Sequence, residues 1–198
     1  MSNRLVFNPE DHSYLLNGSR VPSVTQALGV MDAFRDVPEY RLELGRARGT
    51  TTHLVCEYYD RKQLDERTVD PIIVPYFEAW KKFKKDFGFS FPKIETKVYS
   101  TKYRFAGTLD RIGKDKSGEL YIIDLKTGSA LSAITALQIA AYQFAWNEMF
   151  PGKKIKKRLG VLLMPSGNYR VQAYTEKGDL NLFFAALSIY NFKAKNHI

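Results

Sequence analysis

The chain has 198 residues, a formal net charge of +9 at neutral pH and a pI of about 9.5. Hydrophobic residues make up 44% of it and aromatic residues 14%, which excludes a disordered composition and suits one domain with a sizeable core. The positive charge favours a polyanionic partner, nucleic acid first among them.

The sequence also limits where the protein works. No apolar run approaches the about 20 residues that a membrane-spanning helix needs, so we expect no membrane partner. The N-terminal residues lack the apolar core of a signal peptide, so we expect a cytoplasmic location. Cys56 is the only cysteine, which excludes an internal disulfide and predicts a small buried core residue.

The first 90 residues predict a β-hairpin followed by helices. Residues 5–7 and 13–16 have strand composition, and Asn17-Gly18 is typical of a hairpin turn. Ser23 and Gln26 have the spacing of a capping box and predict a short helix that ends near Phe34.

Two longer helices are predicted next. The first, over 39–61, is interrupted near Gly45 and Gly49 and carries His53 and Glu57 one turn apart. A lone helical histidine is most often a satisfied polar residue at the edge of a core, and Glu57 is equally well a partner of His53 or a solvated carboxylate. The second helix, over 71–87, has an apolar stripe with lysines on its other face.

The remaining residues predict a sheet and two more helices. Strands are expected over 93–100, 104–126 (a hairpin with its turn at 114–118), 159–164 and 169–174, with helices over 133–150 and 176–192 and a polar tail from 191. The last helix is expected to bury Leu180, Leu182, Phe183, Ala186, Leu187 and Tyr190. The fold class is therefore α/β, with a central mixed sheet flanked by helices and an N-terminal hairpin. We expect one domain, 1–198, in which 1–90 supply the hairpin and helices and 91–198 supply the sheet core.

Charged residues end the apolar strands of the central hairpin. Asp110 lies toward the end of the first strand, and Asp124 and Lys126 close the second. Because strand side chains alternate, Asp124 and Lys126 share one face. Burying such charges is costly without a partner or a metal, and paired carboxylates suit a hard divalent cation. A lysine beside them can stabilise the charge that develops in phosphoryl transfer.

Four ordered motifs resemble a known family. They are Gly49-Thr-Thr-Thr-His53, Gly107-Thr-Leu-Asp110, Ile123-Asp124-Leu125-Lys126, and Gln138 with Tyr142 four residues later. Together they resemble the PD-(D/E)XK nuclease superfamily, and its RecB-like branch most closely, over roughly residues 45–145.

The resemblance implies a restriction-endonuclease-like fold and a metal-dependent DNA nuclease. Asp110, Asp124 and the Leu125 carbonyl would hold one or two Mg²⁺ or Mn²⁺ ions, and Lys126 would orient the attacking water or stabilise the oxyanion. Gln138 and Tyr142 would lie beside the active site. His53 becomes a candidate metal ligand, which would favour Mn²⁺ because nitrogen ligands suit transition metals.

The sequence leaves the roles of Glu95 and of the lysine-rich clusters open between two interpretations each. Glu95 loosely matches an acidic position of the superfamily, but an exposed strand glutamate fits equally well. The lysine-rich clusters are either solvated faces or phosphate-contacting surfaces. Their members are Lys81, Lys82, Lys84, Lys85, Lys153, Lys154, Lys156, Lys157 and Arg158.

The predicted function is a DNA exonuclease. It would hydrolyse phosphodiester bonds from the ends of DNA that is single-stranded or has single-stranded ends, in recombination, repair or replication. A recombination or replication protein is a candidate partner, and a bacterial or phage-infected cell is the expected setting. Some RecB-like nucleases hold an iron–sulfur cluster with four cysteines, and a single cysteine predicts none here. The alternatives are a structure-dependent endonuclease of the same fold and a catalytically idle nucleic-acid-binding module.

Overall fold

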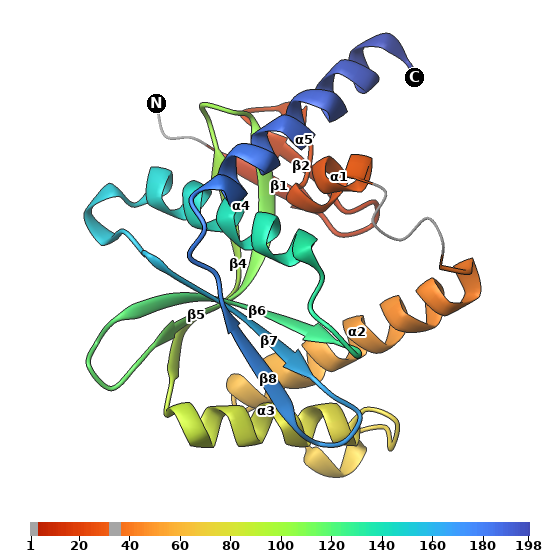
Figure 1. The fold of residues 1–198 in the computed structure, drawn as a ribbon, viewed down its shortest axis with the longest axis vertical. Helices are drawn as coiled ribbons and strands as arrows, with labels where there is room; N and C mark the ends of the chain where they lie inside the picture. Colours follow the sequence, from red (N-terminus) through yellow and green to blue (C-terminus); the bar gives the residue numbers. More distant parts are fainter. Residues whose placement is uncertain (1–3, 32–36) are drawn as a thin grey trace.

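The computed structural model describes residues 4–31 and 37–198, which form three layers (Figure 1). A five-stranded sheet lies in the middle, with α4 and α5 on one face and α2 and α3 on the other. The elements are β1 (Leu5–Asn8), β2 (Ser13–Leu16), β3 (Ser19–Val21), α1 (Val24–Leu28), η1 (Gly29–Met31), α2 (Glu39–Asp60), η2 (Glu66–Thr68), α3 (Val74–Phe87), β4 (Ser90–Ser100), β5 (Phe105–Lys114), β6 (Leu120–Thr127), α4 (Ala133–Met149), η3 (Pro151–Lys153), β7 (Lys157–Leu163), β8 (Tyr169–Ala173) and α5 (Gly178–Asn196).

The central sheet is mixed, as the sequence predicts. Its strand order is β4-β5-β6-β7-β8, and all neighbours are antiparallel except β6 and β7, which are parallel and joined by α4. A parallel pair needs a long crossover, and an α-helix is the usual one. The smaller sheet β1-β2-β3 is antiparallel and packs with α1 beside the central layers. The arrangement is consistent with a restriction-endonuclease-like core.

Strand β6 shows how the sheet divides the core. Ile122 packs in the cluster that contains α4 residues, whereas Ile123 and Leu125 pack in the cluster that contains α3 residues. Each such buried aliphatic side chain contributes on the order of 1.5–3 kcal/mol relative to an exposed one. Strand alternation then puts Asp124 and Lys126 on the α4 side, on one face, as predicted.

Helix α2 corrects one prediction. It runs from Glu39 to Asp60 without a break, although interruptions were expected near Gly45 and Gly49. A helical glycine costs only about 1 kcal/mol relative to alanine, and good helix formers flank Gly45 at Leu44, Arg46 and Ala47. At Gly49 a Cβ atom would lie 3.6 Å from the Thr127 side chain, an ordinary van der Waals distance, so α2 passes close to the end of β6 without requiring a glycine there.

Other boundaries also differ from expectation. The capping box of α1 is present, but the helix gives way to η1 after Leu28, and the predicted end near Phe34 lies outside the described residues. Helix α3 begins at Val74 rather than at 71. Helix α5 continues to Asn196, so the expected polar tail is mostly helical. Leu182 is exposed, because the buried stripe of α5 is centred on Phe183, Ala186 and Leu187.

Candidate active site

The site begins where β5 and β6 separate. Their antiparallel pairing runs from Lys114 and Leu120 to Arg111 and Ile123 and stops there. Asp110 lies just beyond the last pair, and its Oδ2 accepts a hydrogen bond from the Leu125 N–H at 2.7 Å. The Leu125 N–H has no partner in the β5–β6 pairing and donates to the Asp110 carboxylate instead, which fixes Asp110 between the two strands.

Three side chains from three elements meet at this point. His53 of α2, Glu95 of β4 and Asp110 of β5 each offer a ligand atom, and these atoms lie within 4.8 Å of one another. The structure thus brings together His53, from the upstream motif, and Glu95, whose match was loose. One imidazole nitrogen and carboxylate oxygens form a donor set that suits a divalent cation such as Mn²⁺.

The ring of His53 is held in a form that can bind a metal. Its Nε2 lies 3.0 Å from the Leu125 carbonyl oxygen, which can only accept, so Nε2 carries the proton. The lone pair is then on Nδ1, which lies 3.7 Å from Asp110 Oδ2. Burial lowers the pKa of His53, although Asp110 acts to raise it, so the imidazole is neutral at neutral pH. The Leu125 carbonyl is engaged by His53 here and keeps a second lone pair.

Asp124 and Lys126 form an ion pair next to this group. Their Oδ2 and Nζ atoms lie 2.6 Å apart, and Asp124 has no exposed surface. Burial raises the pKa of Asp124 to about 7, against the opposing effect of Lys126. Burial would lower the pKa of Lys126, but Asp124 and Asp110 outweigh it and raise that pKa. Among the described residues, Asp124 Oδ1 has no hydrogen-bond partner, an orphaned buried acceptor that a cation can satisfy.

Glu95 reaches the site through an unusual backbone conformation. Its φ angle is +44°, which is rare for a residue with a side chain and strains the strand. Its Oε1 accepts a hydrogen bond from Arg111 at 3.0 Å. Burial, followed by the nearby charge of Asp110, raises the pKa of Glu95 to about 8. Carboxylates that cannot all ionise together are what a divalent cation stabilises, so the residues present fit the metal that the resemblance implies.

Gln138 and Tyr142 of α4 lie beside the acids. Gln138 Nε2 donates to the Tyr142 hydroxyl at 3.1 Å. Burial and the charge of Asp124 raise the pKa of Tyr142 well above its usual value, so the phenol stays neutral. The Tyr142 ring packs on Gly107, where a Cβ atom would lie 2.6 Å from ring carbon Cε1. Gly107 therefore lets the Tyr142 ring approach the β5 backbone closely.

Sequence reasoning missed a second buried charge cluster next to the site. Arg111 is fully buried, and its Nε donates to Asp60 Oδ2 at 2.8 Å. Its Nη1 donates to Glu95 and to the Asp110 carbonyl oxygen. Trp80 and Lys84 of α3 both contact Asp60 Oδ1. The only clue in the sequence is an arginine between Asp110 and an apolar residue within a buried strand.

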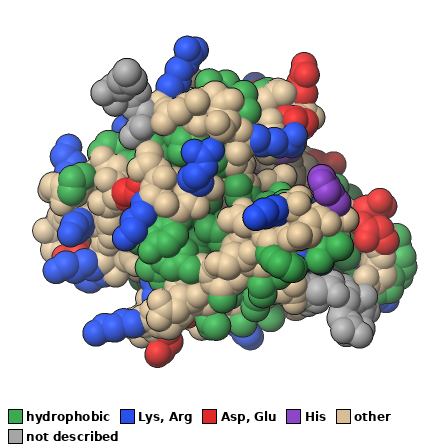
Figure 2. Space-filling model, turned by 90° about the horizontal axis from the view of Figure 1, so that it is seen from above, with side chains coloured by type: hydrophobic (Ala, Val, Ile, Leu, Met, Phe, Trp, Pro, Cys, Tyr) green, Lys and Arg blue, Asp and Glu red, His purple; other side chains and the backbone are tan. Residues whose placement is uncertain are grey.

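Several residues of the lysine-rich clusters have intramolecular partners. Lys81 pairs with Glu66 and Glu78, Lys84 pairs with Asp60, Lys82 donates to Asn168, and Arg158 pairs with Asp179 at 3.0 Å. The Lys157 side chain donates a hydrogen bond to the Tyr121 hydroxyl. The two residues lie opposite each other on β6 and β7, at the other end of these strands from Lys126. Figure 2 shows basic side chains scattered over one face of the molecule rather than gathered in one patch.

Two hollows border the site, beside a smaller third one of about 380 Å³ that is lined by residues that include His53 and Glu95. One of about 730 Å³, here called the Arg46 cleft, is lined by residues that include Thr25, Leu42, Arg46, Lys126, Thr127 and Gln138. The other, of about 430 Å³ and here called the His12 cleft, is lined by residues that include Phe7, His12, Thr25, Glu95, Lys97 and Tyr142. Thr25 lines both, and the Gln138–Tyr142 hydrogen bond joins a residue of one to a residue of the other.

Comparison with known proteins settles the family. Residues 41–183 match the family model of the PD-(D/E)XK nuclease superfamily. The chain belongs to this superfamily. Membership implies a nuclease that acts on nucleic acid, typically with a divalent metal. No curated protein matches the chain.

Among solved structures, one titled "Crystal structure of SSO0001" is similar to the chain. The similarity covers 73% of this chain and 72% of that one, at 12% identity and a TM-score of 0.42.

Over residues 4–31 and 37–198, no helix of this PD-(D/E)XK protein is long and apolar enough to cross a membrane.

Proposed function

We propose that this PD-(D/E)XK protein is a metal-dependent DNA exonuclease of the RecB-like branch, which hydrolyses phosphodiester bonds from DNA ends. The observation that carries the proposal is the convergence of His53, Glu95 and Asp110 next to the Asp124–Lys126 pair, in one buried and acid-rich site. An end-directed activity of this kind serves recombination, repair or replication.

The acids and the histidine would hold the metal. Nδ1 of His53 and the carboxylates of Glu95 and Asp110 would be ligands, and the orphaned Oδ1 of Asp124 and the Leu125 carbonyl would complete sites for one or two Mg²⁺ or Mn²⁺ ions. A bound ion supplies neutralisation of the phosphate charge and an activated water.

The other site residues would act directly on the substrate. The Lys126 ammonium stays charged, because nearby acids raise its pKa, so it can donate to the attacking water or to the phosphate oxygen on which charge develops. The neutral Tyr142 hydroxyl and the Gln138 amide lie on the same side of the sheet and can position a phosphate. Burial around Asp124 excludes water and strengthens each of these interactions.

The shape around the site supports cleavage from ends. The Arg46 cleft runs between α2 and the region of α1 and α4, and Lys126 lies on its wall. A strand that passes between helices in this way enters most simply by threading, which requires a free end. The lysine-rich clusters, chiefly the exposed Lys153, Lys154 and Lys156, would add weaker contacts to DNA farther away.

Digestion of matched DNA substrates tests the proposal. A single-stranded circle and the same strand linearised are incubated with Mg²⁺, Mn²⁺ or EDTA. We expect the linear strand to be consumed with metal only, while the circle survives enzyme amounts that consume the linear form. Comparable cutting of both would establish an endonuclease. DNA binding without any cleavage in either metal would establish the idle binding module.

A further inference from the structure

The His12 cleft has a positive charge, on Lys97, that no acid among the described residues balances. Glu57 on its wall pairs with Arg61 at 2.9 Å, and Glu95 pairs with Arg111. Lys97 also lines the cleft and is exposed, and no acid among the described residues pairs with it. An unpaired ammonium on the wall of a cleft next to a nuclease site is available to a phosphate.

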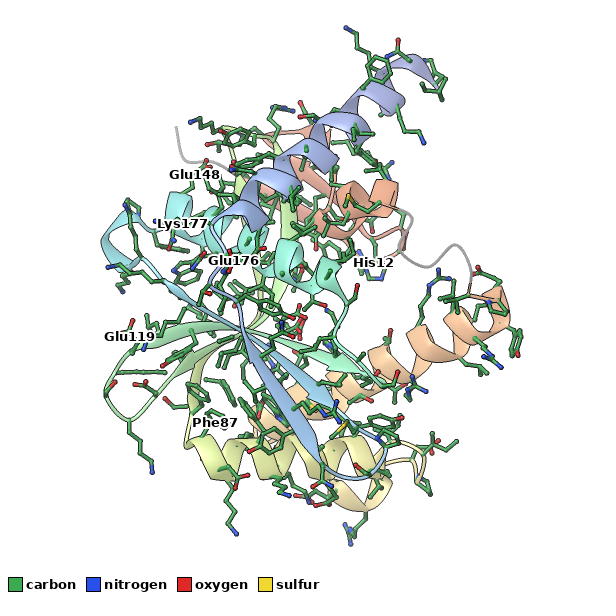
Figure 3. The ribbon with its side chains drawn as sticks, in the orientation of Figure 1. His12, Phe87, Glu119, Glu148, Glu176 and Lys177 are labelled. Carbon is green, nitrogen blue, oxygen red and sulfur yellow. The ribbon has the colours of Figure 1, made fainter. Side chains whose placement is uncertain are left out.

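Aromatic rings hold Lys97 and extend along the same wall. The Lys97 Nζ lies 4.9 Å from the centre of the Phe7 ring, and the Phe7 ring centre lies 5.6 Å from that of His12. His12 is exposed, and Figure 3 shows it just below α1, on the side toward which α2 extends. A cation next to an aromatic row is the combination that binds single-stranded nucleic acid, because a base can stack while its phosphate pairs.

The position of the cleft relates it to the proposed reaction. The Arg46 cleft reaches the acids through Lys126, and the His12 cleft reaches them through Glu95. The two clefts share Thr25 and therefore adjoin each other there. A strand that reaches the acids along one cleft can leave them along the other. The volume of about 430 Å³ lies within the range of about 300–1,000 Å³ that holds one small ligand.

We propose that the His12 cleft is a nucleotide subsite for a single DNA strand, next to the phosphate that is cut. Lys97 contacts a phosphate of that nucleotide, and the row of Phe7 and His12 stacks on its base. The Arg46 cleft holds the strand on the other side of the cut. This inference rests on the proposed nuclease function, which it extends from the metal group to the substrate.

Binding of a fluorescein-labelled single-stranded oligonucleotide tests the Lys97 contact. The assay is anisotropy in Ca²⁺ buffer over a series of salt concentrations, with the intact length of the oligonucleotide checked on a gel. Lys97→Ala should weaken binding and flatten the plot of log affinity against log salt by about 0.7, the value for one contact to a single strand. The control is Lys93→Ala, which removes the same charge from an exposed position of β4 outside the cleft. Equal slopes for the two variants would overturn the proposal.

Stacking on His12 is tested separately. His12→Ala should weaken binding about fivefold or more without changing the salt slope, and His12→Phe should restore it. Abasic sites placed one position at a time should reveal a position that matters in the wild type and no longer matters in His12→Ala. If the two proteins respond alike at every position, no base stacks on His12.

These measurements are independent of the cleavage assay. Failure of the nuclease proposal would appear as an uncut linear strand or a cut circle, with the binding differences intact. Failure of the subsite would appear as unchanged binding in Lys97→Ala and His12→Ala, with cleavage of linear DNA intact.

Discussion

Two groups of buried charge lie side by side in this protein, and their balance differs. Around Arg111, both carboxylate oxygens of Asp60 have partners, because Trp80 and Lys84 contact Oδ1 and Arg111 contacts Oδ2. Around Asp124, the acids outnumber the bases. Asp124 Oδ1 lacks a partner among the described residues, and the pKa values of Asp124 and Glu95 are raised to about 7 and about 8.

The difference separates a structural role from a functional one. The cluster around Arg111 connects elements, here α2, α3, β4 and β5, because both oxygens of its central carboxylate have donors, although Arg111 Nη2 has no partner among the described residues. A buried cluster with surplus negative charge is costly by itself and is stable only when a cation or a proton joins it. Perturbed carboxylates of the second kind mark candidate active sites. Glu95 belongs to both clusters, because it bonds Arg111 and reaches the metal group.

The largest expected effect comes from the functional cluster. Lys126→Ala and Asp124→Asn should each reduce cleavage of linear DNA by about 100-fold or more, because each removes a group proposed to act on the reacting phosphate or its metal. Cleavage rates are compared with thermal unfolding of the same preparations, and Asp124→Asn should also bind Mn²⁺ more weakly. Turnover like that of the wild type in either variant would contradict the roles proposed for these residues.

Substitutions in the structural cluster around Asp60 and Arg111 should lower the free energy of unfolding. Asp60→Asn removes the charge that pairs with both Arg111 and Lys84 and leaves Glu95 as the acid paired with Arg111, and breaking a buried ion pair costs about 3–5 kcal/mol. Chemical denaturation measures the free energy of unfolding. The matched control is Asp65→Asn, which breaks an exposed pair with Arg67 and should change the free energy of unfolding far less, because solvent screens exposed pairs. A destabilisation as small for Asp60 as for Asp65 would mean that the cluster does not connect the elements.

Proton binding should further distinguish the two clusters. In EDTA, the raised pKa values of Glu95 and Asp124 mean that the folded state holds their protons more tightly than the unfolded chain. The two carboxyl groups stabilise the folded state fully at pH values below about 4, the pKa of such groups in the unfolded chain. This contribution to the free energy of unfolding is lost as the pH rises through their folded-state pKa values of about 7 and about 8. The melting temperature should therefore fall over this range, and Mn²⁺ should restore more of it at pH 8 than at pH 6.

A conservative variant provides the control for this pH dependence. Glu95→Gln keeps the shape of the side chain but cannot titrate, so its melting temperature in EDTA should fall less between pH 6 and pH 9. The same fall in both proteins would assign the pH dependence to other groups.

The smallest expected effect is a change in DNA binding caused by substitutions just before β7, far from the acids. Replacing Lys153, Lys154 and Lys156 with Gln should weaken DNA binding modestly and equally for all sequences. The salt slope should fall by about 0.7 for every single-strand phosphate that these side chains bind in the wild type. Anisotropy over a salt series measures this, with Lys193→Gln as an exposed control on α5. An unchanged slope would show that these lysines form only a solvated face.

The sequence by itself determined the local structure and part of the site. Alternation in β6 put Asp124 and Lys126 on one face, and the spacing of Gln138 and Tyr142 on a predicted helix put them one turn apart. The strands of the central sheet and α4 were predicted close to their observed bounds. These features depend on residues near one another in the chain, where the periods of strand and helix act directly.

Only the tertiary structure decided which distant residues meet. His53 reaches Asp110 because α2 runs unbroken against the end of β6, and Glu95 reaches it through a positive φ that no sequence pattern marks. The packing of Asp60 against Arg111, and the meeting of the two clefts at Thr25, likewise depend on contacts between separate elements. Side chains far apart in the chain converge through the packing of helices on the sheet, and local periodicity carries no information about that packing.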